Sequence, residues 1–137
     1  MAEIQEYTLT RTGERPLKFK GEVIAEAGGR WHTGQEQNRW HEIRIYRTAG
    51  GKHVLEVEYC TCWQGENNYH SAIVYDTVEA AVNALEIFNP LEHLLGFPPH
   101  PQFAEKQARL EDSLRQRWEI LLSDVLGAVP GAAEEIE

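Results

Sequence analysis

The residues best suited to chemistry lie in a short polar segment in which the tripeptide Arg-Trp-His occurs twice. Arginine and tryptophan dominate binding hot spots, and both can stack on an exposed base while arginine also contacts phosphate. The alternative is that the two tryptophans fold back and cover one end of a sheet. The repeat predicts a binding loop that contains the following six residues: Arg30, Trp31, His32, Arg39, Trp40 and His41.

Two cysteines offer a second kind of chemistry. Cys60 and Cys62 form a Cys-x-Cys pair, and on a strand their side chains would share one face. A disulfide between them would be strained, so we expect two reduced thiols, as is typical of a cytoplasmic protein. If His70 lies across from Cys62, the three side chains could bind zinc. The alternative is that small cysteine side chains pack beneath a helix.

No familiar catalytic motif accompanies these residues. The sequence contains no Gly-x-Ser-x-Gly, no P-loop, no dinucleotide-binding glycine motif and no His-Glu-x-x-His. The sequence contains cysteines, serines and histidines that could form a Cys/His or Ser/His pair. No motif in it specifies which residues would act as nucleophile, base and orienting group. We therefore expect a non-enzymatic protein that needs no cofactor. A small enzyme or zinc protein that uses Cys60, Cys62 and His70 is the alternative.

The first half of the chain is expected to form the sheet that positions these residues. Alternating apolar residues and Gly- or Pro-containing turns predict strands at 4–10, 17–27, 40–48, 52–63 and 69–75. A three-residue turn centred on Gly50 buries one face of the central hairpin. We expect Tyr59 and Ile73 to join the core. The predicted register pairs Ile45 with Leu55, Ile43 with Val57, His41 with Tyr59, and Arg44 with Glu56.

The second half is expected to be helical. From Asp76 the apolar period changes from two to 3.6, and Asp76 with Glu79 resembles a capping box. Helices are predicted at 77–88, 90–95 and 102–126. The apolar stripe of the last helix is expected to cover the open sheet face, and the alternative is a homodimer seam. The sequence thus predicts an α+β fold, a five-stranded antiparallel β-meander covered on one face by C-terminal helices.

Charge is distributed unevenly along the 137 residues. Residues 1–63 hold nine Lys/Arg and nine Asp/Glu, whereas residues 64–137 hold four and 13, which accounts for the net charge of −9. This balance disfavours nucleic-acid binding except as a local contact from the neutral half. We expect one domain over 1–127 and a flexible acidic tail over 128–137. The acidic candidates for a partner-binding surface on the last helix are Glu105, Glu111, Asp112, Glu119 and Asp124.

The sequence also suggests a location. No apolar run approaches the roughly 20 residues that cross a membrane, and the acidic N-terminal residues do not form a secretory signal. We therefore expect a cytoplasmic protein without a membrane partner.

Three stretches between Phe19 and Glu66, FKGEVIAEA, RWHEIRIYRTAGGKHVLEVEY and WQGE, resemble small uncharacterised bacterial proteins of plasmids and phage-related elements. The resemblance implies a bacterial, mobile-element setting and transfers no activity or site residue. We expect a protein-interaction module that acts as an accessory subunit or inhibitor in a defence, anti-defence or mobile-element system. The alternative is a module that binds a nucleotide or a short single strand through the Arg/Trp/His loop.

Overall fold

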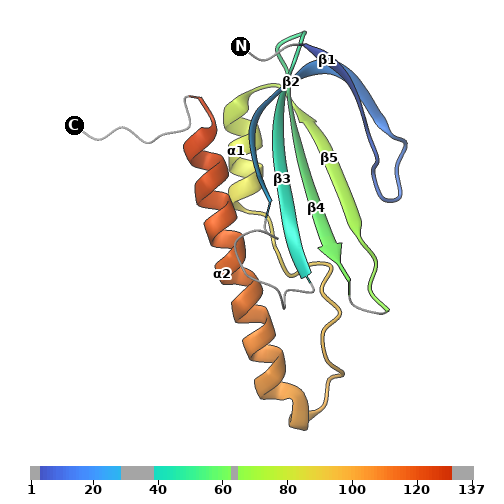
Figure 1. Cartoon of the computed structure of the whole chain (residues 1–137), viewed down its shortest axis with the longest axis vertical. Coiled ribbons are helices and arrows are strands. Elements are labelled where there is room, and N and C mark those ends of the chain that lie inside the picture. The colour runs from blue at the N-terminus through green and yellow to red at the C-terminus, as the bar shows by residue number, and fades with distance from the viewer. Residues whose placement is uncertain (1–3, 29–38, 63–64, 131–137) are drawn as a thin grey trace, which may run out of the picture.

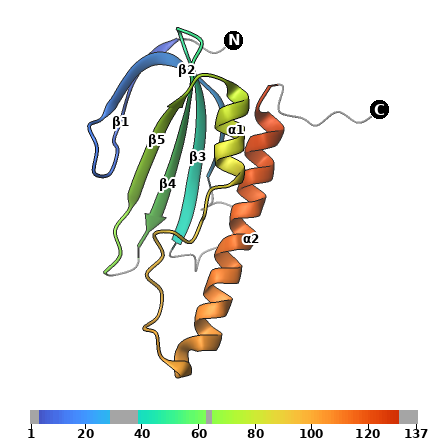
Figure 2. The same cartoon turned by 180° about the vertical axis from the view of Figure 1, so that it is seen from behind.

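The computed structural model describes residues 4–28, 39–62 and 65–130. The five strands form one antiparallel sheet in chain order, and α1 and α2 pack against one of its faces (Figures 1 and 2). The predicted α+β fold is therefore confirmed. The strands are β1 (Gln5–Leu9), β2 (Leu17–Gly28), β3 (Arg39–Thr48), β4 (His53–Thr61) and β5 (Tyr69–Tyr75). The helices are α1 (Val78–Glu86), the 3₁₀ turn η2 (Pro101–Phe103) and α2 (Ala104–Ala128).

The central β3–β4 hairpin has the predicted register. Its turn is closed by the Thr48 amide, which donates to the Lys52 carbonyl at 2.7 Å, and Gly51 supplies a left-handed backbone with φ of 89°. The register puts Ile43 and Ile45 on the helix-covered face, where both are fully buried. All four predicted pairs are present: Ile45–Leu55, Ile43–Val57, His41–Tyr59 and Arg44–Glu56.

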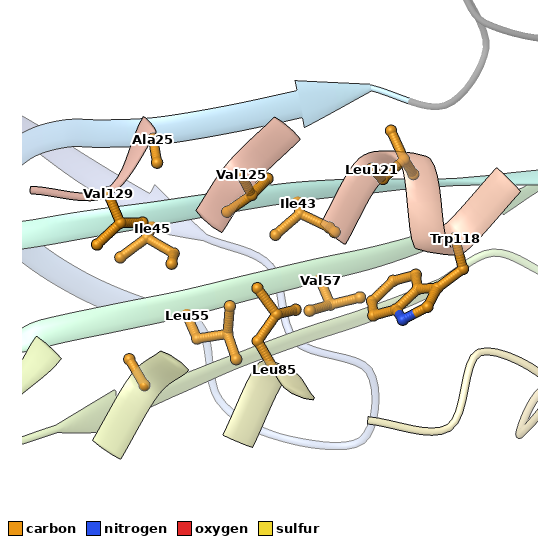
Figure 3. Close-up of a cluster of buried hydrophobic side chains, with 11 residues drawn as sticks. Ala25, Ile43, Ile45, Leu55, Val57, Leu85, Trp118, Leu121, Val125 and Val129 are labelled. Carbon is orange, nitrogen blue, oxygen red and sulfur yellow. The ribbon is translucent and has the colours of Figure 1, made fainter. Parts of the chain in front are cut away.

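The main core lies between the sheet and the two helices. The stripe on α2 packs over β2 and β3, while α1 packs over β4 and β5. Figure 3 shows Trp118, Leu121 and Val125 of α2 against the isoleucines of β3, with Leu85 of α1 beside them. Burying each large aliphatic side chain contributes about 1.5–3 kcal/mol. This packing explains why the last helix carries a broad apolar stripe.

The opposite face of the sheet curls into a half-barrel. The strand β2 changes register between Val23 and Ala25, which bends it and folds the β1–β2 hairpin over the sheet. The hairpin loop reaches β5, where the amide of Thr12 donates to the carbonyl of His70 at 2.9 Å and the amide of His70 donates to Thr12 Oγ1 at 2.9 Å. A second, smaller core fills the curl around the ring of Tyr46.

Several predicted details are wrong. The predicted helix 90–95 is a series of turns, because the Leu95 amide donates to the side chain of Glu66 at 3.1 Å instead of continuing a helix. Ile73 is 46% exposed, since β5 is an edge strand that α1 covers only in part. The last helix extends to Ala128, and Val129 is buried in the main core, so the predicted tail begins too early. Residues 131–137 lie outside the described residues.

The predicted capping box is also wrong, by one residue. Thr77, rather than Asp76, caps α1, and its Oγ1 accepts from the Ala80 amide at 3.1 Å. Asp76 is instead an exposed partner of Lys52 at 3.8 Å.

We expect Thr77→Ala to lower the free energy of unfolding by about 1 kcal/mol, because the Ala80 amide loses its partner. Asp76→Ala should cost less than about 0.5 kcal/mol, as is typical of an exposed ion pair. Equilibrium denaturation of both variants tests the assignment, and a larger loss for Asp76→Ala would contradict it.

Candidate functional site

The second Arg-Trp-His copy begins strand β3, while the first copy, Arg30, Trp31 and His32, lies outside the described residues. Side chains alternate along a strand, so Arg39 and His41 share the helix-covered face and Trp40 lies on the other face. All three are buried, with exposed fractions of 7% for Arg39, 2% for His41 and 9% for Trp40. The three therefore belong to the interior of the molecule rather than to an exposed loop, and their role in ligand binding stays a prediction.

Arg39 is held by a carboxylate that the sequence did not suggest. Its Nε donates to both oxygens of Glu66, at 2.9 and 3.0 Å, and the Glu66 side chain is only 2% exposed. Tyr59 and Thr61 donate their hydroxyls to the same carboxylate at 2.9 and 2.8 Å, and the Leu95 amide adds a further bond. Burial acts to raise the pKa of Glu66, but these donors together lower it below its ordinary value.

The Glu66 carboxylate fixes the path of the long connection between α1 and α2. Strand β3 contributes Arg39, β4 contributes Tyr59 and Thr61, and the connection contributes the Leu95 amide. Residues on either side of Leu95 then face two different hollows, described below. In the sequence, Glu66 is only the acidic residue of a Gly-Glu-Asn-Asn turn, and no neighbouring residue distinguishes it from an exposed turn residue.

His41 lies in an aromatic cluster beneath α2. Its ring centroid is 4.9 Å from that of Trp118, 5.3 Å from that of Tyr59 and 6.2 Å from that of Phe88. Burial, followed by the positive charge of Arg117 and by His93, lowers the pKa of His41 to about 4. The ring is therefore neutral at physiological pH and serves packing.

The residues predicted to bind zinc are not brought together. Strand register places His70 opposite Glu58 rather than across from Cys62, and the His70 Nδ1 lies 3.6 Å from a Glu58 oxygen. Cys60 is buried, whereas Cys62 is exposed just beyond the end of β4. The predicted juxtaposition was wrong because the last β4–β5 pair is Tyr59–Tyr69, so the connection between the paired parts of the two strands is longer than the four-residue turn that was expected.

A different set of side chains could hold a cation on the curled face. Ligand atoms of Glu42, Glu58 and Cys60 lie within 4.8 Å of one another, and no other such trio occurs in the described ranges. The Cys60 thiol donates to Glu42 at 3.4 Å, and burial, with the two carboxylates, raises the pKa of the thiol. Nearby, Arg44 pairs with Glu42 at 3.8 Å. The thiol is therefore protonated and already hydrogen-bonded, which opposes metal binding at neutral pH.

The predicted acidic surface of α2 is neutralised in part by the helix itself. Glu111 and Asp112 both contact Arg115, at 3.8 and 3.3 Å, and Glu105 lies 4.0 Å from Arg109. These i,i+3 and i,i+4 pairs are typical of a solvated helix face. A partner surface that includes Glu119 and Asp124 stays a prediction.

An apolar groove lies between the edge strand β5 and helix α1, and we call it the β5–α1 groove. It has a volume of about 340 Å³, and Leu55 and Val57 of β4 form its floor. The ring of His93 stacks on Tyr69 at one end, with centroids 3.6 Å apart. Its remaining lining residues are Ser71, Ile73, Tyr75, Ala84, Ile87, Phe88 and Glu92.

A second hollow lies between the connection and the first turns of α2, and we call it the linker–α2 pocket. It has a volume of about 430 Å³. Its described lining residues are Arg39, Gly96, Phe97, Lys106, Arg109 and Leu110. Of these, only Arg39 was singled out from the sequence. The others are ordinary surface residue types, and only the turn of the chain at Leu95 brings them together.

No protein-family model matches the chain, and no curated protein or solved structure is significantly similar to it. In the part of the chain that the structure describes, no helix is both long and apolar enough to cross a membrane.

We expect Glu66→Ala to lower the free energy of unfolding by about 3–5 kcal/mol, because it leaves the buried Arg39 charge without its carboxylate. The matched control is Glu105→Ala, which removes an exposed carboxylate and should cost less than about 0.5 kcal/mol. Urea denaturation measures both. Similar losses for the two variants would contradict the central role of Glu66.

The depressed pKa of His41 predicts a pH-dependent stability. In the unfolded chain the His41 ring binds a proton near pH 6.5, but in the folded chain it does so only near pH 4. The stability that the neutral ring contributes is therefore complete above pH 6.5 and declines toward pH 4. Between pH 7 and 5 the loss should be about 2 kcal/mol. The variant His41→Phe keeps an aromatic ring and should show a correspondingly flatter profile. If the free energy of unfolding of His41→Phe depends on pH as steeply as that of the wild type, the assignment is contradicted.

Proposed function

We propose that the chain is a non-enzymatic protein-interaction module and that its partner docks in the β5–α1 groove. The observation that carries the proposal is the pair of isoleucines at the groove, Ile73 with 46% and Ile87 with 85% of its surface exposed. Large apolar side chains exposed around a hollow are typical of binding surfaces. In Figure 2 strand β5 lies on the side of the sheet away from α2 and runs past the end of α1, so the helices cover this side of the sheet only in part.

The groove walls favour an apolar anchor from the partner. Tyr69, Tyr75 and Phe88 line it with rings, and the stacked Tyr69–His93 pair closes one end. Aromatic pockets that exclude water around one inserted side chain are the usual form of an interaction hot spot. The volume is near the lower end of the roughly 300–1,000 Å³ range of ligand pockets. We therefore expect one or two large apolar side chains to insert.

The charge around the groove favours a basic partner. Glu92 is the one Asp, Glu, Lys or Arg among the described lining residues, and α1 adds Glu79 and Glu86. The sequence contains no lysine or arginine between residues 64 and 105. Charge complementarity between partners steers association and excludes wrong partners. The proposed partner therefore presents an apolar anchor flanked by Lys or Arg.

The biological setting follows from the resemblance to bacterial mobile-element proteins. An accessory subunit or inhibitor in a defence, anti-defence or mobile-element system would act by such docking. Contact with a basic partner also agrees with the concentration of negative charge in the second half of the chain.

A crosslinking experiment tests the proposal. A photoreactive phenylalanine analogue replaces Ile73 in one protein and Ile120 in another, and both are irradiated in bacterial lysate. Ile120 on α2 is the matched control, because it is 47% exposed and does not line the groove. We expect a specific adduct from position 73 alone, and its crosslinked segment should contain Lys or Arg beside an apolar residue.

The variant Ile73→Glu should then reduce affinity for the recovered partner at least about tenfold, whereas Ile120→Glu should leave it unchanged, with melting temperatures as the folding check. Equal adducts at both positions, or no adduct at either, would contradict the proposal. An adduct to a second copy of this chain would identify a homodimer instead of a basic partner.

A further inference from the structure

We propose that the linker–α2 pocket binds a small organic anion with an apolar body. The pocket has a volume of about 430 Å³, which suits a ligand of this size. Every charged residue in its described lining is a cation: Arg39, Lys106 and Arg109. In a chain with a net charge of −9, a hollow with this lining is unexpected.

One wall of the pocket is fastened to α2 by Gln107. The Phe97 amide donates to the Gln107 Oε1 at 2.8 Å, and Phe97 also stacks on Phe103 with ring planes 11° apart. Gly96 has a left-handed backbone with φ of 65°, which favours glycine, and a Cβ there would displace the amide end of the Gln107 side chain. The wall is therefore formed before a ligand arrives, which lowers the entropy lost on binding.

Arg39 also lines the pocket, and its orientation is fixed by Glu66. Because Glu66 already balances the charge of Arg39, the excess positive charge of the pocket comes from Lys106 and Arg109. Arg109 lies 4.0 Å from Glu105, and both side chains are largely exposed. Such a pair contributes little, so an incoming anion can replace it.

Further along the helix, Arg117 adds to the positive potential. It is half-buried, and burial, followed by the nearby charge of Arg39, lowers the pKa of Arg117.

The lining specifies the class of ligand. Phe97 and Leu110 offer contact to a flat or acyl body, while the cations match a phosphate or carboxylate with charge-assisted hydrogen bonds. An aryl or acyl phosphate or carboxylate satisfies both requirements. The described lining residues of this pocket and of the β5–α1 groove are all different, so the two proposals stand or fall separately.

Isothermal titration calorimetry with 2-naphthyl phosphate tests the inference. The comparison ligands are 2-naphthol, which lacks the anion, and inorganic phosphate, which lacks the apolar body. We expect 2-naphthyl phosphate to bind at least about tenfold more tightly than either. The double variant Lys106→Gln/Arg109→Gln should abolish that difference. The matched control is Arg115→Gln, which removes an exposed arginine outside the lining and should retain binding.

Three outcomes would overturn the inference. Equal affinity for 2-naphthol would mean a purely apolar hollow, and equal affinity for inorganic phosphate would mean unspecific attraction to surface charge. If Arg115→Gln loses as much affinity for 2-naphthyl phosphate as the double variant does, the effect belongs to the charge of the helix as a whole. Absence of binding also contradicts it, provided that melting temperatures show the proteins to be folded.

Discussion

The buried carboxylate of Glu66 is the interaction on which the arrangement of this molecule depends. It accepts hydrogen bonds from β3, from β4 and from the connection that leads to α2. A buried carboxylate is tolerated only when its charge and its lone pairs are matched, and Arg39 with three further donors provides that match. The connection is thereby fixed to the open end of the sheet instead of continuing as a helix.

Both candidate surfaces follow from this fixed point. Two residues before Leu95, the ring of His93 stacks on Tyr69 and closes the β5–α1 groove. Immediately after it, Gly96 and Phe97 form a wall of the linker–α2 pocket. The groove is apolar and acidic, whereas the pocket is apolar and basic. Two neighbouring hollows of opposite charge result, although Glu92, Lys106 and Arg109 all come from the acidic second half of the chain.

The structure could be predicted from the sequence where local patterns specify it. Alternation around Gly50 and Gly51 determined the β3–β4 register, and the 3.6 period identified the stripe of α2. The sequence was insufficient where a contact joins distant residues. Arg39 and Glu66 are 27 residues apart, and neither residue carries a local signal for the other. A second contact of Glu66, with the Leu95 amide, ends the predicted helix 90–95. The position of β5 at the sheet edge, which exposes Ile73, is equally non-local.

Residue-resolved hydrogen exchange of the Leu95 amide tests the central role of Glu66 most directly. The amide lies in a connection without regular secondary structure, and within residues 4–28, 39–62 and 65–130 its acceptor is Glu66, so its protection reports on that bond. We expect exchange at least about 100-fold slower than in an unstructured peptide, with protection lost at low denaturant in Glu66→Gln. Exchange of the wild-type amide at the unprotected rate would contradict it.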